Sequence, residues 1–296
     1  MQPSTINNVV MPLALGIIML GLGLSLTLDD FKRVLTYPRA VLVGLFCQMI
    51  LLPAVAVGVA HLFNLPPALA VGLMLLAAAP GGATANLFSH LAKGDVALNI
   101  TLTAVNSLLA LFTLPLIVNW SLVHFLGEGQ VIPMVFDKVI QVFIIVLGPV
   151  AIGMAVRRNA PATADRLDKP VRILSALFLV LVIAAAVAKE RANLADYFQQ
   201  VGLAALAFNV VSMAVGYFIP RLFGVLTRQA VAIGMEIGIH NGTLAIYLAN
   251  QILKRDDMAI SPAIYSLIMF FTAAAFGTFM ARRTAAEQGS EPASAP

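Results

Sequence analysis

Long apolar stretches alternate with short polar segments along almost the whole chain. Nine of these stretches are about 20 residues long, which is the length that an α-helix needs to cross a bilayer. The pattern therefore predicts an all-α polytopic membrane protein with nine transmembrane helices. We expect the spans at roughly 9–28, 39–63, 68–92, 96–120, 136–156, 171–188, 200–223, 229–252 and 260–281.

The composition supports a chain that is surrounded by lipid. Hydrophobic residues make up 60% of the 296 residues and charged residues 11%, whereas a soluble domain carries about 25% charged residues. The single cysteine, Cys47, excludes an internal disulfide and a metal site built on cysteines. We expect one transporter domain over 1–283 and, because its residues are small and polar, a disordered tail over 284–296.

The Lys and Arg residues indicate how the chain is oriented. With the N-terminus outside and the C-terminus in the cytoplasm, thirteen of the 18 Lys and Arg residues fall on the cytoplasmic side, where cationic loops are normally found. We therefore predict a multi-pass protein of the cell (inner) membrane. The five outer cations are Lys138, Lys189, Arg191, Lys254 and Arg255.

The two halves of the chain form a weak internal repeat, over about 9–120 and about 136–283. The second span carries Gln48 and the seventh carries Asn209 at a similar depth, and the third and eighth spans are both interrupted at their centres. Five crossings separate the matched elements, so the two copies face opposite ways across the membrane. Such an inverted-topology repeat is typical of secondary transporters.

Both interrupted spans contain residues that disfavour a continuous helix. In the third span, Pro80 lacks an amide hydrogen and its ring clashes with the preceding turn, and Gly81 and Gly82 allow φ values that other residues resist. Gly238 and Gly242 mark the matching break in the sequence EIGIHNG. A packing kink is the alternative, since glycine and proline are common in membrane helices. A true break would free carbonyl groups for a cation and N–H groups for an anion.

Glu236 is the only acidic residue well inside a predicted span. A buried carboxylate is unfavourable unless it is paired, and no Lys or Arg lies at matching depth. Either a proton or a bound cation must then balance its charge; the alternative is a carboxyl group that burial keeps protonated. Neutral side-chain oxygens on the second, third and fourth spans favour a monovalent cation over a divalent one. They belong to Gln48, Asn86, Asn99, Thr103, Asn106 and Ser107.

The four histidines fall into two groups. His240 follows Glu236 by one helical turn on the same face, where it could donate to Glu236, bind substrate or titrate near neutral pH. His61, His90 and His124 lie near the ends of spans, where we expect interfacial side chains rather than ligands.

Motifs of other functional classes are not found. The chain has no Walker loop, no G-x-G-x-x-G after a strand, no G-x-S-x-G and no H-E-x-x-H. A membrane-embedded enzyme would also need a second catalytic carboxylate, a nucleophile with its base or a metal cluster within the spans. We therefore expect neither an enzyme nor a protein that binds nucleic acid. Without a nucleotide site, uphill transport must draw on an ion gradient.

Three segments resemble the bile acid:sodium symporter family: GIIMLGLGLSL at 16–26, AAAPGGATANLFSHLAKGDVALNITLT at 77–103 and EIGIHNG at 236–242. The resemblance extends over about 9–283, and its two broken-helix motifs are fairly specific. It implies a nine-span member in which spans 1, 5 and 6 form a panel and the other six form a core. Within the core, spans 3 and 8 would cross at their breaks, with two sodium ions bound behind the crossing.

The resemblance also implies the ligands of the first sodium ion. They are Asn86, Asn99, Thr103, Glu236 and the backbone carbonyl of Ala85. Ala85 stands where the family usually has a serine, so only its main chain can serve. Asn99 also replaces a serine but keeps a side-chain oxygen.

The second sodium site would use Gln48, Glu236, the carbonyl groups of Ile237 and Ile239, and position 240. The family usually has glutamine at that position, and this chain has His240. An imidazole nitrogen is a poor ligand for sodium. We therefore expect a second site that is weaker, altered or sensitive to pH.

The family's substrates are organic anions, so the resemblance implies a sodium-coupled symporter that works by alternating access. The anion would be a bile salt, a pantoate-like acid or an oxo-acid, held near Ala83, Thr84 and Asn241. Sodium is then a co-substrate, and no other cofactor is expected. The alternative is a proton-coupled carrier that uses Glu236 and His240. The identity of the anion, the number of sodium ions and the oligomeric state stay open.

Overall fold

The computed structural model describes residues 11–127, 136–189 and 194–289. Within these ranges the chain is helical, and the pairing of extended backbone is limited to one bridge between Gly81 and His240. The prediction of an all-α protein is therefore confirmed for the described part.

The first half of the chain combines long helices with one broken helix. In chain order its elements are α2 (Met11–Ser25), α3 (Leu28–Lys32), the 3₁₀ turn η2 (Arg33–Leu35), α4 (Pro38–Phe46), the π-helical turn η3 (Cys47–Leu51), α5 (Leu52–Leu62), α6 (Pro67–Ala78), α7 (Ala83–Leu91) and α8 (Val96–Leu126).

The second half also combines long helices with one broken helix. Its elements are α9 (Phe136–Asn159), α10 (Pro161–Lys189), α11 (Leu194–Leu222), α12 (Thr227–Gly238), α13 (Gly242–Tyr247), the π-helical turn η5 (Leu248–Ile252), the 3₁₀ turn η6 (Asp256–Ala259) and α14 (Ile260–Gly289). α14 extends past the predicted start of the tail at 284, because Ala285, Ala286, Glu287 and Gln288 are good helix formers.

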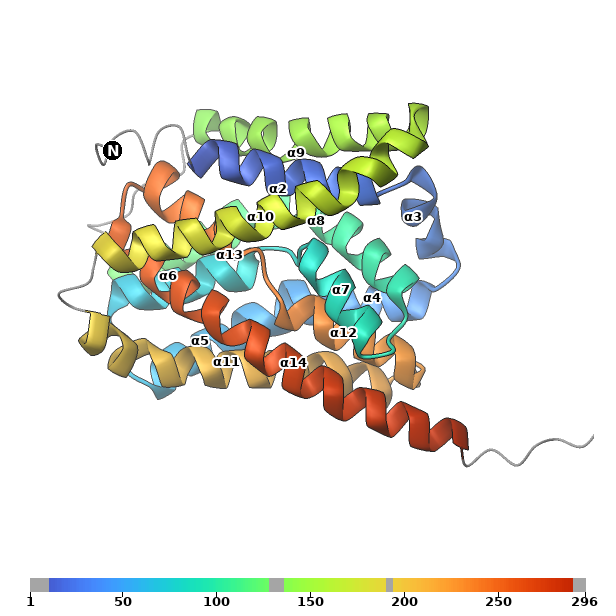
Figure 1. The fold of residues 1–296 in the computed structure, drawn as a ribbon. Helices are drawn as coiled ribbons and strands as arrows, with labels where there is room; N and C mark the ends of the chain where they lie inside the picture. The colour runs from blue at the N-terminus through green and yellow to red at the C-terminus, as the bar shows by residue number, and fades with distance from the viewer. Residues whose placement is uncertain (1–10, 128–135, 190–193, 290–296) are drawn as a thin grey trace, which may run out of the picture.

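The helices lie in two groups. α2, α9 and α10 lie together along the upper edge of the bundle in Figure 1, and α2 contacts both of the others. On the opposite edge, α11 packs against α5 and α14. The half-helices α6 and α12 lie in the interior, where every residue from Leu69 to Ala78 and from Gln229 to Gly238 is buried. A helix that is buried on all sides needs no polar face.

Membrane-spanning helices are present, as predicted. In the described chain, four helices are long and apolar enough to cross a bilayer: Pro38–Leu62, Val96–Leu126, Ala195–Leu222 and Asp256–Arg282. A fifth is added if Pro12–Ser25 and Leu28–Leu35, which are bent by 73°, count as one span. α6 has 12 residues, a length of about 18 Å at 1.5 Å per residue, so it cannot cross alone. The total of nine spans stays a prediction.

Close packing of α2 against α9 depends on two glycines. A Cβ atom added at Gly153 would lie 2.6 Å from the carbonyl oxygen of Leu20 and 2.6 Å from the amide nitrogen of Leu24. A Cβ atom at Gly23 would collide with the backbone of Val150. Since both obstacles are main-chain atoms, no rotamer change can relieve them, and the two helices approach closely only because these positions lack a side chain.

We expect Gly153→Ala to lower the thermal unfolding midpoint in detergent, because the added methyl group must separate α2 from α9 at a cost of about 1–3 kcal/mol. Gly148→Ala is the matched control in the same helix, since nothing lies within 4 Å of a Cβ atom there. The control should match or exceed the parent protein, because alanine favours helix over glycine. Equal destabilisation by the two variants would contradict the proposed contact.

Candidate functional site

Two helices break at the same place inside the protein. α6 ends at Ala78 and α7 begins at Ala83, while α12 ends at Gly238 and α13 begins at Gly242. The two interruptions meet in an antiparallel bridge between Gly81 and His240. The amide of Asn241 donates to the carbonyl oxygen of Pro80 at 2.9 Å.

The breaks form without the left-handed backbone that the glycines permit. Gly82 has φ −130° and ψ 177°, an extended conformation that any residue adopts. In the described chain the glycines with positive φ are Gly127 and Gly224, neither of which belongs to a break. The expectation that Gly81 and Gly82 supply unusual φ values is therefore wrong. Pro80 is the direct cause of the first break, because it disfavours helical backbone at Ala79, which has ψ 138°.

Gly81 is required instead by the close approach of Glu236. A Cβ atom at Gly81 would lie 2.5 Å from the carboxyl carbon of Glu236 and 2.5 Å from its Oε1. Glu236 comes from α12, so its side chain reaches across to the backbone of the other broken helix. The break in α6–α7 thereby forms one wall of the carboxylate pocket.

The carboxylate of Glu236 is fully buried and is held by neutral donors on α8. The hydroxyl of Thr103 donates to its Oε2 at 2.6 Å, and the side-chain amide of Asn106 donates to its Oε1 at 3.3 Å. No Lys or Arg forms an ion pair with Glu236 within the described ranges. The predicted shared face of Asn99, Thr103 and Asn106 is confirmed, since all three are buried on this side of α8.

Four amide oxygens on the helices that form the crossing or pack against it have no hydrogen-bond donor in the described part of the chain. The amide nitrogen of Asn99 donates to the carbonyl of Ala232 at 2.7 Å, and that of Gln48 donates to the carbonyls of Ala77 and Ala79 at 3.3 and 3.2 Å. A carbonyl only accepts, so the nitrogen must face it and the amide oxygen is left over. The buried oxygens without a donor are those of Gln48, Asn86, Asn99 and Asn106.

These oxygens suit a cation. A buried acceptor without a partner is unfavourable, and oxygen is the ligand atom that a hard cation prefers. A small cavity lined by Gln48, Pro80, Asn106 and Thr113 lies beside the crossing, with room for about one water molecule. Gln48 reaches it from the π-helical turn η3, a distortion that is frequent at functional positions.

His240 is not placed as predicted. The helix that contains Glu236 ends at Gly238, so His240 does not follow it on the same helical face. Its Nδ1 lies 3.1 Å from the carbonyl oxygen of Ala79, and its ring stacks on Phe208 with centroids 6.1 Å apart and planes at 6°. Its Nε2 has no partner among the described side chains and backbone groups.

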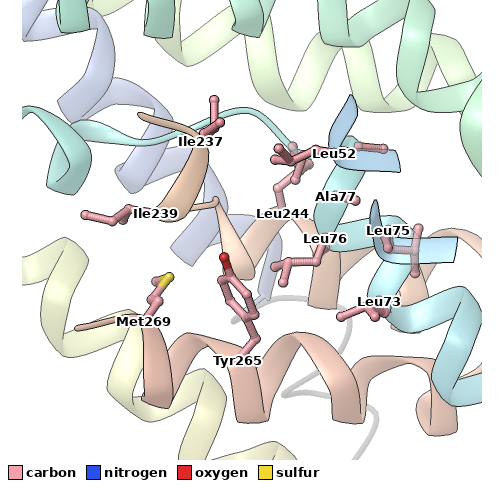
Figure 2. Close-up of a cluster of buried hydrophobic side chains, with 14 of the residues drawn as sticks. Leu52, Leu73, Leu75, Leu76, Ala77, Ile237, Ile239, Leu244, Tyr265 and Met269 are labelled. Atoms are coloured by element: carbon pink, nitrogen blue, oxygen red, sulfur yellow. The ribbon is translucent and has the colours of Figure 1, made fainter. Parts of the chain in front are cut away.

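Side chains of the neighbouring helices hold the end of α12. The carbonyl oxygen of Gly238 accepts from the amide of Asn209 at 2.8 Å and from the hydroxyl of Tyr265 at 2.9 Å. Figure 2 shows the Tyr265 hydroxyl directed towards the break, with Ile237, Ile239 and Leu244 around it. Asn209 in turn accepts from Thr272. Asn209 therefore bridges α12 and α14.

The remaining predicted ion ligands lie in the walls of the crossing. Ala85, Ile237 and Ile239 are fully buried, so only their main chains can offer oxygen to an ion. Asn86 lies in the first turns of α7 and is 9% exposed.

The predicted anion-binding residues lie at the two helix N-termini that face the crossing. Thr84 is partly exposed in the first turn of α7, and the side chain of Ala83 lies outside the described part. The Oδ1 of Asn241 caps α13 by accepting from the amide of Leu244 at 3.0 Å, which leaves its buried Nδ2 without an acceptor in the described structure. Free N–H groups at a helix N-terminus attract anions.

Three side chains have roles at the crossing that the sequence did not indicate. Asn106 was considered only as one neutral oxygen among several, yet it donates directly to Glu236. Tyr265 and Thr272 were missed, although their spacing of seven puts them on one face of α14. That spacing was the available signal.

Comparisons with known proteins identify the family of this chain. Residues 12–197 match the model of the Sodium Bile acid symporter family. An uncharacterized sodium-dependent transporter of Bacillus subtilis (strain 168) is 28% identical over 280 residues, which is 95% of this chain and 85% of that protein. The ileal sodium/bile acid cotransporter of Oryctolagus cuniculus is 23% identical over 95% of this chain and 81% of its own length.

A plant protein extends the comparison. A probable chloroplastic sodium/metabolite cotransporter of Arabidopsis thaliana, BASS1, is 27% identical over 90% of this chain and 66% of its own length. The chain belongs to the sodium bile acid symporter family. The resemblance drawn from the three sequence segments is confirmed, and so is the expectation that the protein is not an enzyme, because this family and these relatives are transporters.

Membership of the sodium bile acid symporter family makes the chain a multi-pass membrane protein of a sodium-dependent transporter class. The breaks at Gly81 and His240 lie on both sides of the limit of the family match, at residue 197. The family match therefore includes only the first break. The similarity to the Bacillus protein, over 280 residues, extends into the second half of the chain. Which residues bind sodium in this chain stays a prediction.

We expect Gly81→Ala to displace the carboxylate of Glu236 and to lower the thermal unfolding midpoint, because overpacking at a buried site typically costs about 1–3 kcal/mol. Gly82→Ala is the neighbouring control, since the nearest atom to its Cβ is the flexible Thr84 hydroxyl at 3.7 Å. Differential scanning fluorimetry in detergent measures both. A larger loss in Gly82→Ala than in Gly81→Ala would contradict this account of the pocket.

Proposed function

We propose that the protein is a sodium-coupled symporter of an organic anion that works by alternating access. The observation that carries the proposal is the buried carboxylate of Glu236 at the crossing of two broken helices, held only by neutral donors and neighboured by amide oxygens that lack donors. A mobile cation supplies the missing charge and the missing donors at once. The relatives are named as sodium-dependent transporters or sodium cotransporters, which supports sodium as that cation.

The first sodium ion binds Glu236 together with Asn86, Asn99, Thr103 and the carbonyl of Ala85. Asn86 and Asn99 support this set because each buries an amide oxygen without a donor. One carboxylate and several neutral oxygens leave the loaded site close to neutral, which suits burial in the membrane better than an isolated charge.

The second sodium ion binds near Gln48, Glu236 and the carbonyls of Ile237 and Ile239. The free amide oxygen of Gln48 supports this position. His240 contributes nitrogen rather than oxygen, and its Nδ1 already faces the carbonyl of Ala79. This site therefore binds sodium more weakly than the first.

The anion binds where the N-termini of α7 and α13 meet, near Ala83, Thr84 and Asn241. The helix dipoles at this point and the buried Nδ2 of Asn241, which has no acceptor in the described structure, support an anion. The relatives named for bile acids and metabolites support an organic acid as the cargo. A bile salt, a pantoate-like acid or an oxo-acid fits this description.

The two groups of helices support a mechanism of alternating access. α2, α9 and α10 act as a panel, and the helices around the crossing act as a core that rocks against it in an inverted repeat of nine spans, with the N-terminus outside the cell membrane. Sodium favours the conformation that holds the anion. A hundredfold shift between two conformations needs only about 2.7 kcal/mol of differential binding.

Proton coupling through Glu236 and His240 is the alternative, and the geometry favours it less. The ring of His240 faces the carbonyl of Ala79 rather than the carboxylate. Replacing sodium by choline at constant pH separates the two mechanisms, because a sodium-coupled carrier stops and a proton-coupled carrier continues.

We expect Glu236→Gln to abolish sodium-driven uptake while folded protein stays in the membrane. The substitution preserves size but removes the charge that holds the cation. Uptake of labelled taurocholate and pantoate into proteoliposomes under a sodium gradient, with binding of radioactive sodium in detergent, measures the loss. Sodium-driven uptake at the parent rate would refute the role of this residue.

We expect Thr103→Val to weaken sodium binding by at least about tenfold, because a hydrogen bond to a charged group contributes about 1.5–3 kcal/mol. Thr101→Val is the matched control, since Thr101 is equally buried on α8 but bonds only to the carbonyl of Ala97 at 2.9 Å. Sodium titration followed by thermal shift compares the two. Equal weakening in both variants would count against a specific contribution from Thr103.

A further inference from the structure

We propose that His61 and His124 form a binding site for a divalent transition-metal cation of the copper, nickel and zinc class, at the ends of α5 and α8. Their Nε2 atoms lie 3.0 Å apart, although the residues are 63 positions apart in the chain. Both side chains are exposed, so an ion can reach them from solvent. This expands the expectation for two of the three histidines near span ends, which were predicted to be interfacial side chains only.

The separation of the two nitrogens fits one metal ion. Imidazole nitrogens bind these metals at about 2.0–2.1 Å, and two such bonds with nitrogens 3.0 Å apart enclose an angle of about 94° at the metal. That angle is close to the right angle between neighbouring ligands in square-planar or octahedral coordination, the geometry typical of copper and nickel sites. A slightly larger separation gives the tetrahedral angle of zinc.

The protonation states allow binding without loss of a proton. In the structure, one Nε2 must donate to the other, because two lone pairs at 3.0 Å would repel. When the metal binds, the donor ring moves its proton from Nε2 to Nδ1. Both Nε2 lone pairs then face the ion, and both rings stay neutral, which is the form that ligates metals.

Neighbouring aromatic rings hold the pair in position. Trp120 stacks on His124 with centroids 4.6 Å apart and planes at 11°, and Phe125 contacts His124 edge-on at 4.7 Å and His61 at 5.5 Å. Rings that are fixed before binding lose less entropy when the ion arrives. The two rings are therefore held side by side in the metal-free protein, and binding needs only a turn of the rings and the shift of one proton.

The electrostatic surroundings also favour a cation. His61 lies in the last turn of α5 and His124 in the last turn of α8. The C-terminal ends of helices carry partial negative charge, which stabilises positive charge nearby. Two helix ends therefore direct their dipoles at the same ion.

This site is separate from the crossing. Asn106 and His124 are 18 residues apart on α8, a distance of about 27 Å along the helix axis. A metal ion at the histidine pair therefore cannot contact Glu236, and its main local effect is to tie the end of α5 to the end of α8.

The test uses the full chain, purified without a polyhistidine tag. Titration with Cu²⁺ or Ni²⁺ should give one saturable site per chain, and the electron paramagnetic resonance spectrum of bound Cu²⁺ should show two coordinating nitrogens. His61→Ala and His124→Ala should each weaken binding by more than about tenfold, because the second ligand no longer acts within the same molecule. The unfolding midpoint without metal should change little, since both side chains are exposed.

His90→Ala is the control, because His90 is an exposed histidine on another helix, α7. It should bind the metal as the parent protein does. Unchanged affinity in His61→Ala and His124→Ala, a Cu²⁺ spectrum with one nitrogen, or a loss of binding in His90→Ala would each overturn the proposal. His124→Gln gives the same comparison if the alanine variant unfolds. None of these outcomes depends on sodium transport.

Discussion

The structure depends on one constraint, the burial of an acidic side chain that has no cationic side chain to pair with in the described part. Glu236 is fully buried, its oxygens accept hydrogen bonds from Thr103 and Asn106, and Gly81 lies against its carboxyl group. Neutral donors reduce the energy of a buried charge but do not remove it. On the proposed function, a bound cation balances this charge and so couples ion binding to one conformation of the protein.

The crossing of the broken helices is the second requirement. The burial of Glu236 accounts for it. A continuous α6–α7 helix would place side chains where the carboxylate now lies against Gly81. Breaking two helices exposes backbone groups, which must find partners inside a membrane. The bridge between Gly81 and His240 and the bonds from Asn209 and Tyr265 to Gly238 meet that need.

Much of this was predictable because its physical causes are local in the chain. The length and apolar character of the spans indicated a helical membrane protein, and the isolated Glu236 marked the site because an unpaired acid in lipid requires an explanation. The shared face of Asn99, Thr103 and Asn106 followed from helical spacing alone. In each case, neighbours along the chain determined the outcome.

Tertiary structure decided whatever depended on residues distant in the chain. Helical periodicity predicted that His240 lies on the same face as Glu236. Because α12 ends before His240, its ring instead contacts Ala79 and Phe208. The need for glycine at position 81 arises from a carboxylate 155 positions away (236 − 81) rather than from its own φ angle. Likewise, His61 meets His124 only because two helix ends pack together. Composition and spacing thus determined which polar side chains lie within the membrane spans. Tertiary packing determined which of these side chains contact each other.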